Sequence, residues 1–141
     1  MKSSKKKREA LIKFSEWQAK AEDDCLAIEA MLKEGGLPNP ICFHAQQMAE
    51  KYLKGLLVFY DVHVPKVHDL LQLETLLLPM TKDVPELHDD LTLLTRYYIT
   101  TRYPGDYPSF SMKDGREAYE AALRVKNFVL EKIGSKDESK S

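Results

Sequence analysis

Apolar residues recur every three to four positions along most of the chain, which is the spacing of an amphipathic α-helix. This pattern predicts a first helix from about Arg8 to Lys33, ended by Gly35 and Gly36. An extended link, Leu37 to Pro40, separates it from a second helix that reaches about Tyr60. The apolar side of the second helix is wide and consists of Ala45, Met48, Ala49, Tyr52, Leu56, Phe59 and Tyr60.

Three further helices are predicted in the second half of the chain. A short one covers Leu70 to Leu78, with Asp69 placed to cap it. The next runs from about Pro85 to Thr101, and the last from roughly Lys113 to Ile133 with Ser111 as its N-cap. No segment reads as a strand. The fold class is therefore all-α, an antiparallel up-and-down helical bundle of four main helices plus one short helix.

Length and composition indicate one globular domain. The 141 residues are 43% hydrophobic and 30% charged, which is ordinary for a soluble protein with its own core. The domain is assigned to residues 8–134, with Gly134 ending the last helix. A flexible basic N-terminal tail, 1–7, and a flexible polar C-terminal tail, 135–141, flank it.

Charge and cysteine content narrow the function classes. A formal net charge of −1 argues against broad electrostatic binding to nucleic acid, although it allows a local basic patch. Cys25 and Cys42 lack metal-ligand spacing and are expected to be buried free thiols in a reducing compartment. The chain has no targeting signal and no stretch near the roughly 20 apolar residues of a membrane span, so a cytoplasmic protein without membrane contact is expected.

A polar row lies beside the apolar side of the second helix. His44, Gln47 and Lys51 follow i, i+3, i+7 spacing, and Gly55 continues the row one turn later. A glycine inside a helix predicts a close contact there. An ammonium group beside a neutral imidazole and an amide can receive a phosphate or a carboxylate. Equally open is an ordinary surface role, with Lys51 solvated and His44 packed at the edge.

Two other places carry reactive side chains. The pair His68-Asp69 is more simply read as a helix start than as a chemical pair. The run 96–104 interleaves Arg96 and Arg102 with tyrosines that include Tyr103, so it can grip phosphates and stack on a base, or equally serve as core and polar cover. The sequence has no phosphate-binding glycine-rich loop, zinc pattern or nucleophile elbow, and no metal site is expected.

Three segments together resemble a known family, the HEPN domain (higher eukaryotes and prokaryotes nucleotide-binding). They are residues 43–54 (FHAQQMAEKYLK), His68-Asp69-Leu70 and Arg102-Tyr103-Pro104. The resemblance implies a bundle of four to five helices, commonly a homodimer, in a small prokaryotic protein often encoded beside a minimal nucleotidyltransferase. Relatives are proposed to bind nucleotides or to assist that partner.

Many HEPN relatives are metal-independent ribonucleases of toxin–antitoxin or defence systems, and this sequence departs from their pattern. Those enzymes carry an arginine followed four to six residues later by a histidine. No histidine stands at that spacing after Arg8, Arg96, Arg102, Arg116 or Arg124. The general acid or base is thus missing where the chemistry needs one, and no catalytic residue is assigned.

The favoured interpretation is a non-enzymatic, dimeric HEPN-like module that binds a nucleotide, ATP or GTP, or partners a nucleotidyltransferase. No other cofactor is expected. Lys51 and Arg102 are expected to hold phosphate and Tyr103 to stack on a base. The binding residues are His44, Gln47, Lys51, Arg96, Arg102 and Tyr103. Two alternatives stay open: a ribonuclease toxin acting on RNA through a non-standard Arg/His site, and a structural dimerisation domain.

Overall fold

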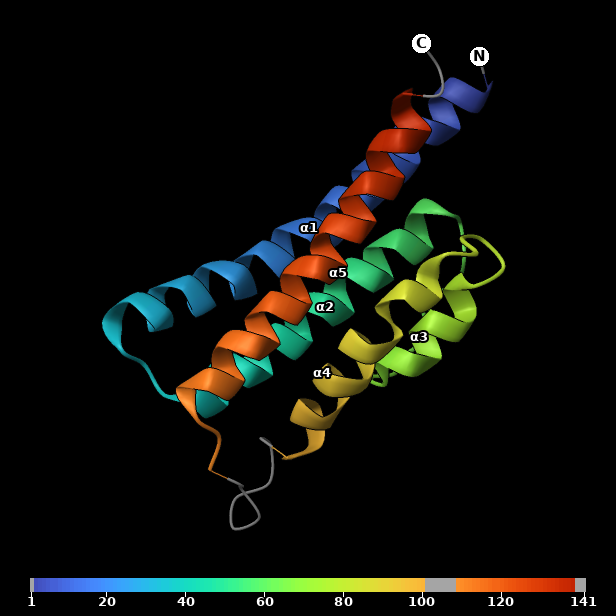
Figure 1. The fold of residues 1–141 in the computed structure, drawn as a ribbon. Helices are drawn as coiled ribbons and strands as arrows, with labels where there is room; N and C mark the ends of the chain where they lie inside the picture. The colour runs from blue at the N-terminus through green and yellow to red at the C-terminus, as the bar shows by residue number, and fades with distance from the viewer. Residues whose placement is uncertain (1, 101–108, 139–141) are drawn as a thin grey trace.

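The computed structural model describes residues 2–100 and 109–138, and within these ranges the chain is helical without strands. The predicted all-α bundle is confirmed. Figure 1 shows α1, α2 and α5 running side by side, with α3 and α4 covering the other side of α2. The elements are α1 (Lys2–Glu34), α2 (Pro38–Phe59), α3 (Leu70–Leu77), the 3-10 turn η1 (Val84–Leu87), α4 (His88–Thr100) and α5 (Met112–Glu138).

Helix α2 is the centre of the bundle, because it contacts each of α1, α3, α4 and α5. Its predicted apolar side is buried, from Ala45 to Phe59, and only Tyr60 beyond the helix end is half-buried. The close contact predicted at Gly55 is also confirmed. A Cβ atom there would lie 3.0 Å from Phe14 Cδ1 and 3.1 Å from Trp17 Cβ, both on α1. Glycine therefore lets α1 and α2 approach each other closely at this point.

Several helix ends differ from the prediction. Helix α1 begins at Lys2 rather than Arg8, and α5 continues through Gly134 to Glu138. Lysine and glutamate are good helix formers, so polar terminal turns can extend a helix where no apolar pattern marks its end. Helix α2 starts at Pro38, inside the link predicted to be extended, because a proline suits the first helical position. The flexibility of the two tails and the domain limits stay predictions.

The predicted N-caps are confirmed. Asp69 Oδ1 accepts a hydrogen bond from the Leu71 amide at 3.0 Å. Ser111 and Asp114 form a reciprocal capping box at the start of α5: the Asp114 amide donates to Ser111 Oγ at 3.1 Å, and the Ser111 amide donates to Asp114 Oδ2 at 2.9 Å. The helix predicted from Pro85 is instead split, since η1 precedes an α4 that begins at His88.

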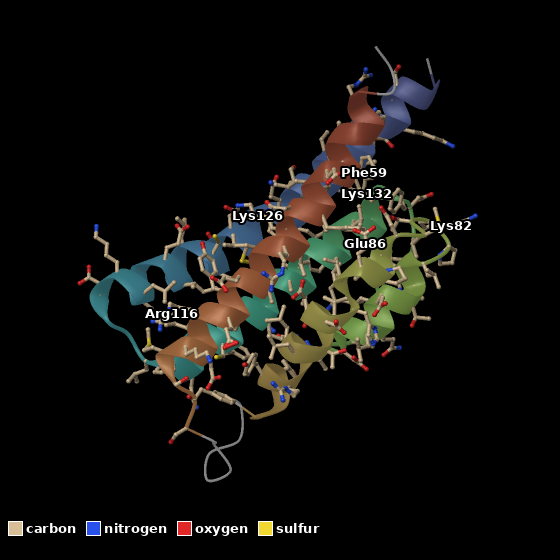
Figure 2. The ribbon with its side chains drawn as sticks, viewed as in Figure 1. Phe59, Lys82, Glu86, Arg116, Lys126 and Lys132 are labelled. Carbon is tan, nitrogen blue, oxygen red and sulfur yellow. The ribbon has the colours of Figure 1, made fainter. Side chains whose placement is uncertain are left out.

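Two lysines of α5, labelled in Figure 2, attach that helix to its neighbours. Lys126 Nζ donates to Glu22 of α1 at 3.0 Å, and Lys132 Nζ donates to Asp83 just before η1. The hydrogen bonds from Lys132 and Thr81 lower the pKa of Asp83. These contacts hold α5 across both sides of the bundle.

Both cysteines are buried and free, as predicted. Burial raises the pKa of Cys42 to about 12 and also raises the pKa of Cys25. Neither thiol is therefore a ready nucleophile at neutral pH. None of the helices in the described ranges is long and apolar enough to cross a membrane.

Candidate functional site

The carboxylate of Asp24, on α1, joins two residues of the polar row on α2. His44 Nδ1 lies 2.7 Å from Asp24 Oδ1, and Lys51 Nζ donates to Asp24 Oδ2 at 2.6 Å. His44 and Lys51 are two helical turns apart, so one carboxylate on a neighbouring helix can contact both. The Asp24 side chain is 8% exposed, against 34% for His44 and 24% for Lys51. We call these three residues the Asp24 cluster.

A second carboxylate, Glu50, lies on α2 itself. Lys54 Nζ donates to Glu50 Oε2 at 3.0 Å, and Gln46 Nε2 donates to Glu50 Oε1 at 3.2 Å. These side chains are neighbours because they follow i, i+4 spacing. From the connection between α2 and α3, His68 places its Nδ1 3.1 Å from Glu50 Oε1, and its carbonyl oxygen accepts from Gln46 at 3.1 Å. We call these four residues the Glu50 cluster.

The two clusters have the same composition at their centres. In each, a buried carboxylate is bound by one lysine and one histidine through Nδ1. The Glu50 and Lys54 side chains are only 6% and 8% exposed, and a charge buried this deeply is strongly destabilising without a partner. With both histidines neutral, each cluster carries no net charge. The ammonium groups of Lys51 and Lys54 are thus neutralised within the protein.

An aromatic layer links the clusters at the surface. It consists of Phe43, His68 and Tyr98. The His68 ring stacks on Tyr98 with centroids 4.2 Å apart and an interplanar angle of 15°, and Phe43 stacks on Tyr98 at 6.3 Å. Phe43 also meets the His44 ring edge-on at 6.1 Å. The His68 side chain is 48% exposed, so the ring face that does not meet Tyr98 is open to solvent.

The predicted site residues are only partly brought together. His44 and Lys51 share Asp24, and Gln47 Nε2 donates to Gln46 Oε1 at 2.7 Å, which connects the row to the Glu50 cluster. Arg96 is exposed on α4, two residues before Tyr98, so the two side chains leave the helix about 200° apart. Arg102 and Tyr103 lie outside the described residues. Their roles, and that of Arg96, stay predictions.

Sequence reasoning missed most of the partners. Asp24, Glu50 and Lys54 were not identified as site residues, although the spacing of Gln46, Glu50 and Lys54 is visible in the sequence as an i, i+4, i+8 row. The interpretation of His68-Asp69 as a helix start is confirmed for Asp69, which caps α3. His68 does more than precede that helix, because its ring belongs to both the Glu50 cluster and the aromatic layer.

The chemistry available on this face is hydrogen bonding and stacking. Each histidine uses Nδ1 for its carboxylate, which leaves Nε2 of His44 and of His68 for a ligand. The open ring face of His68 can stack on a planar group. In the part of the chain that the structure describes, no three His, Cys, Asp or Glu side chains are placed to hold a metal ion.

This combination defines an all-helical module with a polar and aromatic face on its central helix. The chain belongs to the HEPN family, since the model of the HEPN domain matches residues 14–133. That match spans every residue of the two clusters and the aromatic layer. No curated protein matches this chain.

Solved structures agree with the family assignment. TT1696 from Thermus thermophilus is 32% identical, and the match covers 84% of this chain and 97% of that protein with a TM-score of 0.74. ST0689, described as an archaeal HEPN homologue, is 28% identical, with 85% of this chain and 97% of that one covered and a TM-score of 0.69. The fold seen here is therefore shared with these two proteins over nearly their whole length.

Proposed function

We propose that this HEPN protein is a non-enzymatic binding module that takes a nucleotide, ATP or GTP, on the face formed by the aromatic layer and the two clusters. The observation that supports it best is the half-exposed His68 ring stacked on Tyr98. A planar base can extend this stack by one member. Base–aromatic stacking contributes about 1–3 kcal/mol per base, which is enough to matter for a small ligand.

The residues around the stack offer directional hydrogen bonds rather than an unpaired charge. His44 Nε2 and the side-chain oxygen of Gln47, Oε1, can form hydrogen bonds with a base or a ribose. Lys51, the phosphate ligand expected from the sequence, is bound by Asp24, which makes it a weaker anion receptor than a lone ammonium group. In this proposal the phosphates are held by Arg102, and Tyr103 adds a second stacking surface.

Calorimetric titration with ATP and GTP, with and without magnesium, tests the proposal. We expect micromolar binding, worth about 8 kcal/mol. His68→Ala is expected to weaken binding by about fivefold or more, because the stack is lost. His68→Phe, which keeps a ring but not the bond to Glu50, is expected to restore most of the affinity. His88→Ala is the matched control, since His88 is an exposed histidine that pairs with Glu74 instead.

Absence of heat with any nucleotide would contradict the nucleotide version and leave the partner version. In that version the same face binds a minimal nucleotidyltransferase, and the HEPN protein is a homodimer. Co-elution of the two purified proteins from a sizing column, lost in His68→Ala, is the expected result. Separate elution of the HEPN protein and the nucleotidyltransferase contradicts this version.

One observation favours a second candidate, a ribonuclease acting on RNA. His44 and His68 are each oriented by a buried carboxylate with Nε2 left open, which suits a general acid or base. The test is cleavage of single-stranded RNA in EDTA, with His44→Ala and Arg102→Ala as variants. Cleavage that neither substitution changes would exclude this site. If no ligand or activity is found and the substitutions alter stability alone, the module is a structural dimerisation domain.

A further inference from the structure

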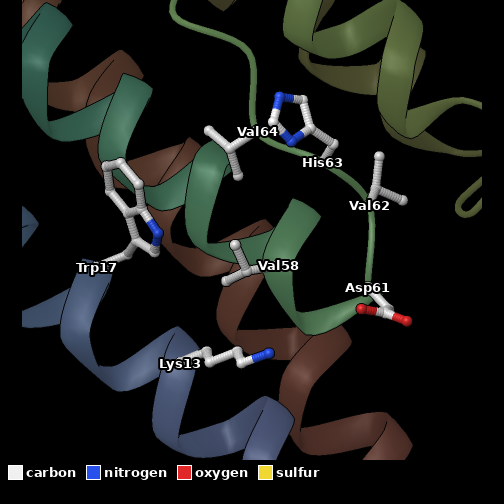
Figure 3. A pocket seen from close by; sticks show the side chains of 7 residues that line it. All are labelled: Lys13, Trp17, Val58, Asp61, Val62, His63 and Val64. Atoms are coloured by element: carbon white, nitrogen blue, oxygen red, sulfur yellow. The ribbon is translucent and has the colours of Figure 1, made fainter.

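A hollow of about 550 Å³ lies between α1 and the chain that follows α2, away from the α2 face described above. Its lining is mixed. Figure 3 shows the Trp17 indole and the His63 imidazole at one side of it, the Lys13 and Asp61 side chains at the other, and Val58 between them. Lys20 Nζ lies 5.4 Å from the centroid of the Trp17 ring and so helps to hold the indole. The volume falls within the range of small-molecule sites, about 300–1,000 Å³, and the hollow is open to solvent on one side.

Asp61 occupies a backbone conformation at the end of α2 that glycine adopts more easily. Its φ is +60°, in the left-handed region. The Val62 amide donates to the Leu57 carbonyl at 2.9 Å and the Asp61 amide to the Val58 carbonyl at 3.0 Å, which makes Asp61 the C′ residue of a Schellman motif. Glycine is the usual residue there. Aspartate enters this region more readily than most side chains, yet its negative charge meets the negative end of the helix dipole.

The polar groups around the hollow have no partners among the described residues. Lys13, Asp61 and His63 are exposed, and they make no side-chain hydrogen bond or ion pair within the ranges 2–100 and 109–138. In Figure 3 the Lys13 ammonium points towards Asp61 without reaching it. Lys13 is positive and Asp61 is negative, and the space between them separates the two charges. A molecule that carries one charge of each sign can pair with both. The unfavourable choice of aspartate at the helix end is explained if that molecule needs an anion here.

We propose that this hollow binds a free α-amino acid with an apolar side chain. The ligand ammonium pairs with Asp61 and the ligand carboxylate with Lys13. The apolar side chain lies against Trp17 and Val58, and His63 closes the far side. None of the residues of this site belongs to the two clusters or the aromatic layer; Trp17 contacts the Glu50 cluster through Lys54, whose Nζ lies 6.0 Å from the ring centroid.

Trp17 makes the proposal easy to test, because it is the single tryptophan of the chain. Its fluorescence reports on this hollow and on Lys54, whose Nζ lies 6.0 Å from the ring centroid, so the substitutions at Asp61 and Lys13 are needed to assign the signal to the hollow. L-leucine and L-phenylalanine are the probes, and we expect a saturable change with each. N-acetyl-leucine lacks the ammonium group and leucinamide lacks the carboxylate. Each is expected to bind about tenfold more weakly or worse, because a hydrogen bond to a charged group is lost.

Two variants locate the charges. Asp61→Asn keeps a residue that tolerates the left-handed region, and Lys13→Gln keeps a polar stem on an exposed helix position. Each is expected to weaken leucine binding about tenfold, while a thermal melt shows that the fold is intact. The matched controls are Asp23→Asn and Lys82→Gln, both outside the hollow.

Three results would overturn the proposal. The first is no saturable change with either amino acid. The second is equal binding of leucine and N-acetyl-leucine, which would show that the ammonium group is not recognised. The third is binding of a leucyl peptide without binding of free leucine, which would indicate a docking site for a protein segment.

Discussion

Replacement of Asp24 by asparagine tests whether the α2 row is held inside the protein or is available to a ligand. The substitution keeps the size of the side chain and removes its charge. Lys51 then loses the carboxylate oxygen that lies 2.6 Å from its Nζ, and His44 loses the charged oxygen that lies 2.7 Å from its Nδ1. The neighbouring Asp23 is more exposed on the same helix, so Asp23→Asn is the matched control.

The size of the effect follows from the burial of the partners. Removal of one member of a buried ion pair costs about 3–5 kcal/mol. The Lys51 side chain is 24% exposed, so its flexible stem can carry the ammonium group towards water. We therefore expect a smaller loss, about 2–3 kcal/mol of the free energy of unfolding. For a domain of this length that corresponds to a fall in Tm of about 6–10 °C.

The assay is urea unfolding of Asp24→Asn, Lys51→Met and the double variant. A coupling energy of about 1–3 kcal/mol between the two positions is expected, because each single change leaves the other partner unpaired. Asp23→Asn should change stability by less than about 0.5 kcal/mol. If Asp24→Asn is equally mild, the carboxylate does not hold Lys51. The conclusion that this lysine is neutralised within the protein would then be wrong. Lys51 would again be the expected phosphate ligand.

Three further outcomes follow from single contacts. Gly55→Ala places a Cβ atom 3.0 Å from a Phe14 ring carbon, and we expect a net loss of about 1 kcal/mol in urea unfolding, since overpacking exceeds the gain in helix propensity. Asp61→Gly should stabilise the protein by about 0.5–1 kcal/mol in the same assay, because glycine suits the positive φ and removes a charge from the helix end. The pKa of Asp83 is lowered, chiefly by the hydrogen bond from Lys132. The unfolded chain therefore protonates this carboxyl at a higher pH, so its contribution to stability is present above about pH 4 and is lost on acidification. Lys132→Met should flatten that part of a curve of stability against pH, while Lys82→Met should not.

Much of the fold could be predicted because it depends on local rules. The apolar spacing gives the helices, and short-range chemistry gives the caps at Asp69 and Ser111. Gly55 indicates the close approach of α1 and α2. Helix ends were less predictable. The first turns of α1 are polar and exposed, so no apolar pattern marks their start, and a proline such as Pro38 can either break a helix or begin one.

The site was predicted in part, and the missing part is non-local. The row of His44, Gln47 and Lys51 can be read from helical spacing. The choice of Asp24 rather than Asp23 as its partner depends on how α1 is rotated against α2, which local spacing does not contain. The Glu50 cluster was hidden for another reason. Helix α2 is covered on opposite sides, so the polar row of Gln46, Glu50 and Lys54 is buried, and polar residues at helical spacing do not by themselves indicate this.

The internal pairing of both lysines changes what the α2 face can contribute to binding. Lys51 and Lys54 each face a carboxylate, so neither offers an uncompensated positive charge to an incoming phosphate. Displacement of Asp24 from Lys51 would leave a buried anion with one partner, at a cost comparable to the gain from the new contact. If the protein binds a nucleotide as proposed, its phosphates must then rely on a positive charge outside this face, and Arg102 is the residue proposed for it. The face itself contributes selectivity, through the open ring of His68 and the directional hydrogen bonds of His44 and Gln47.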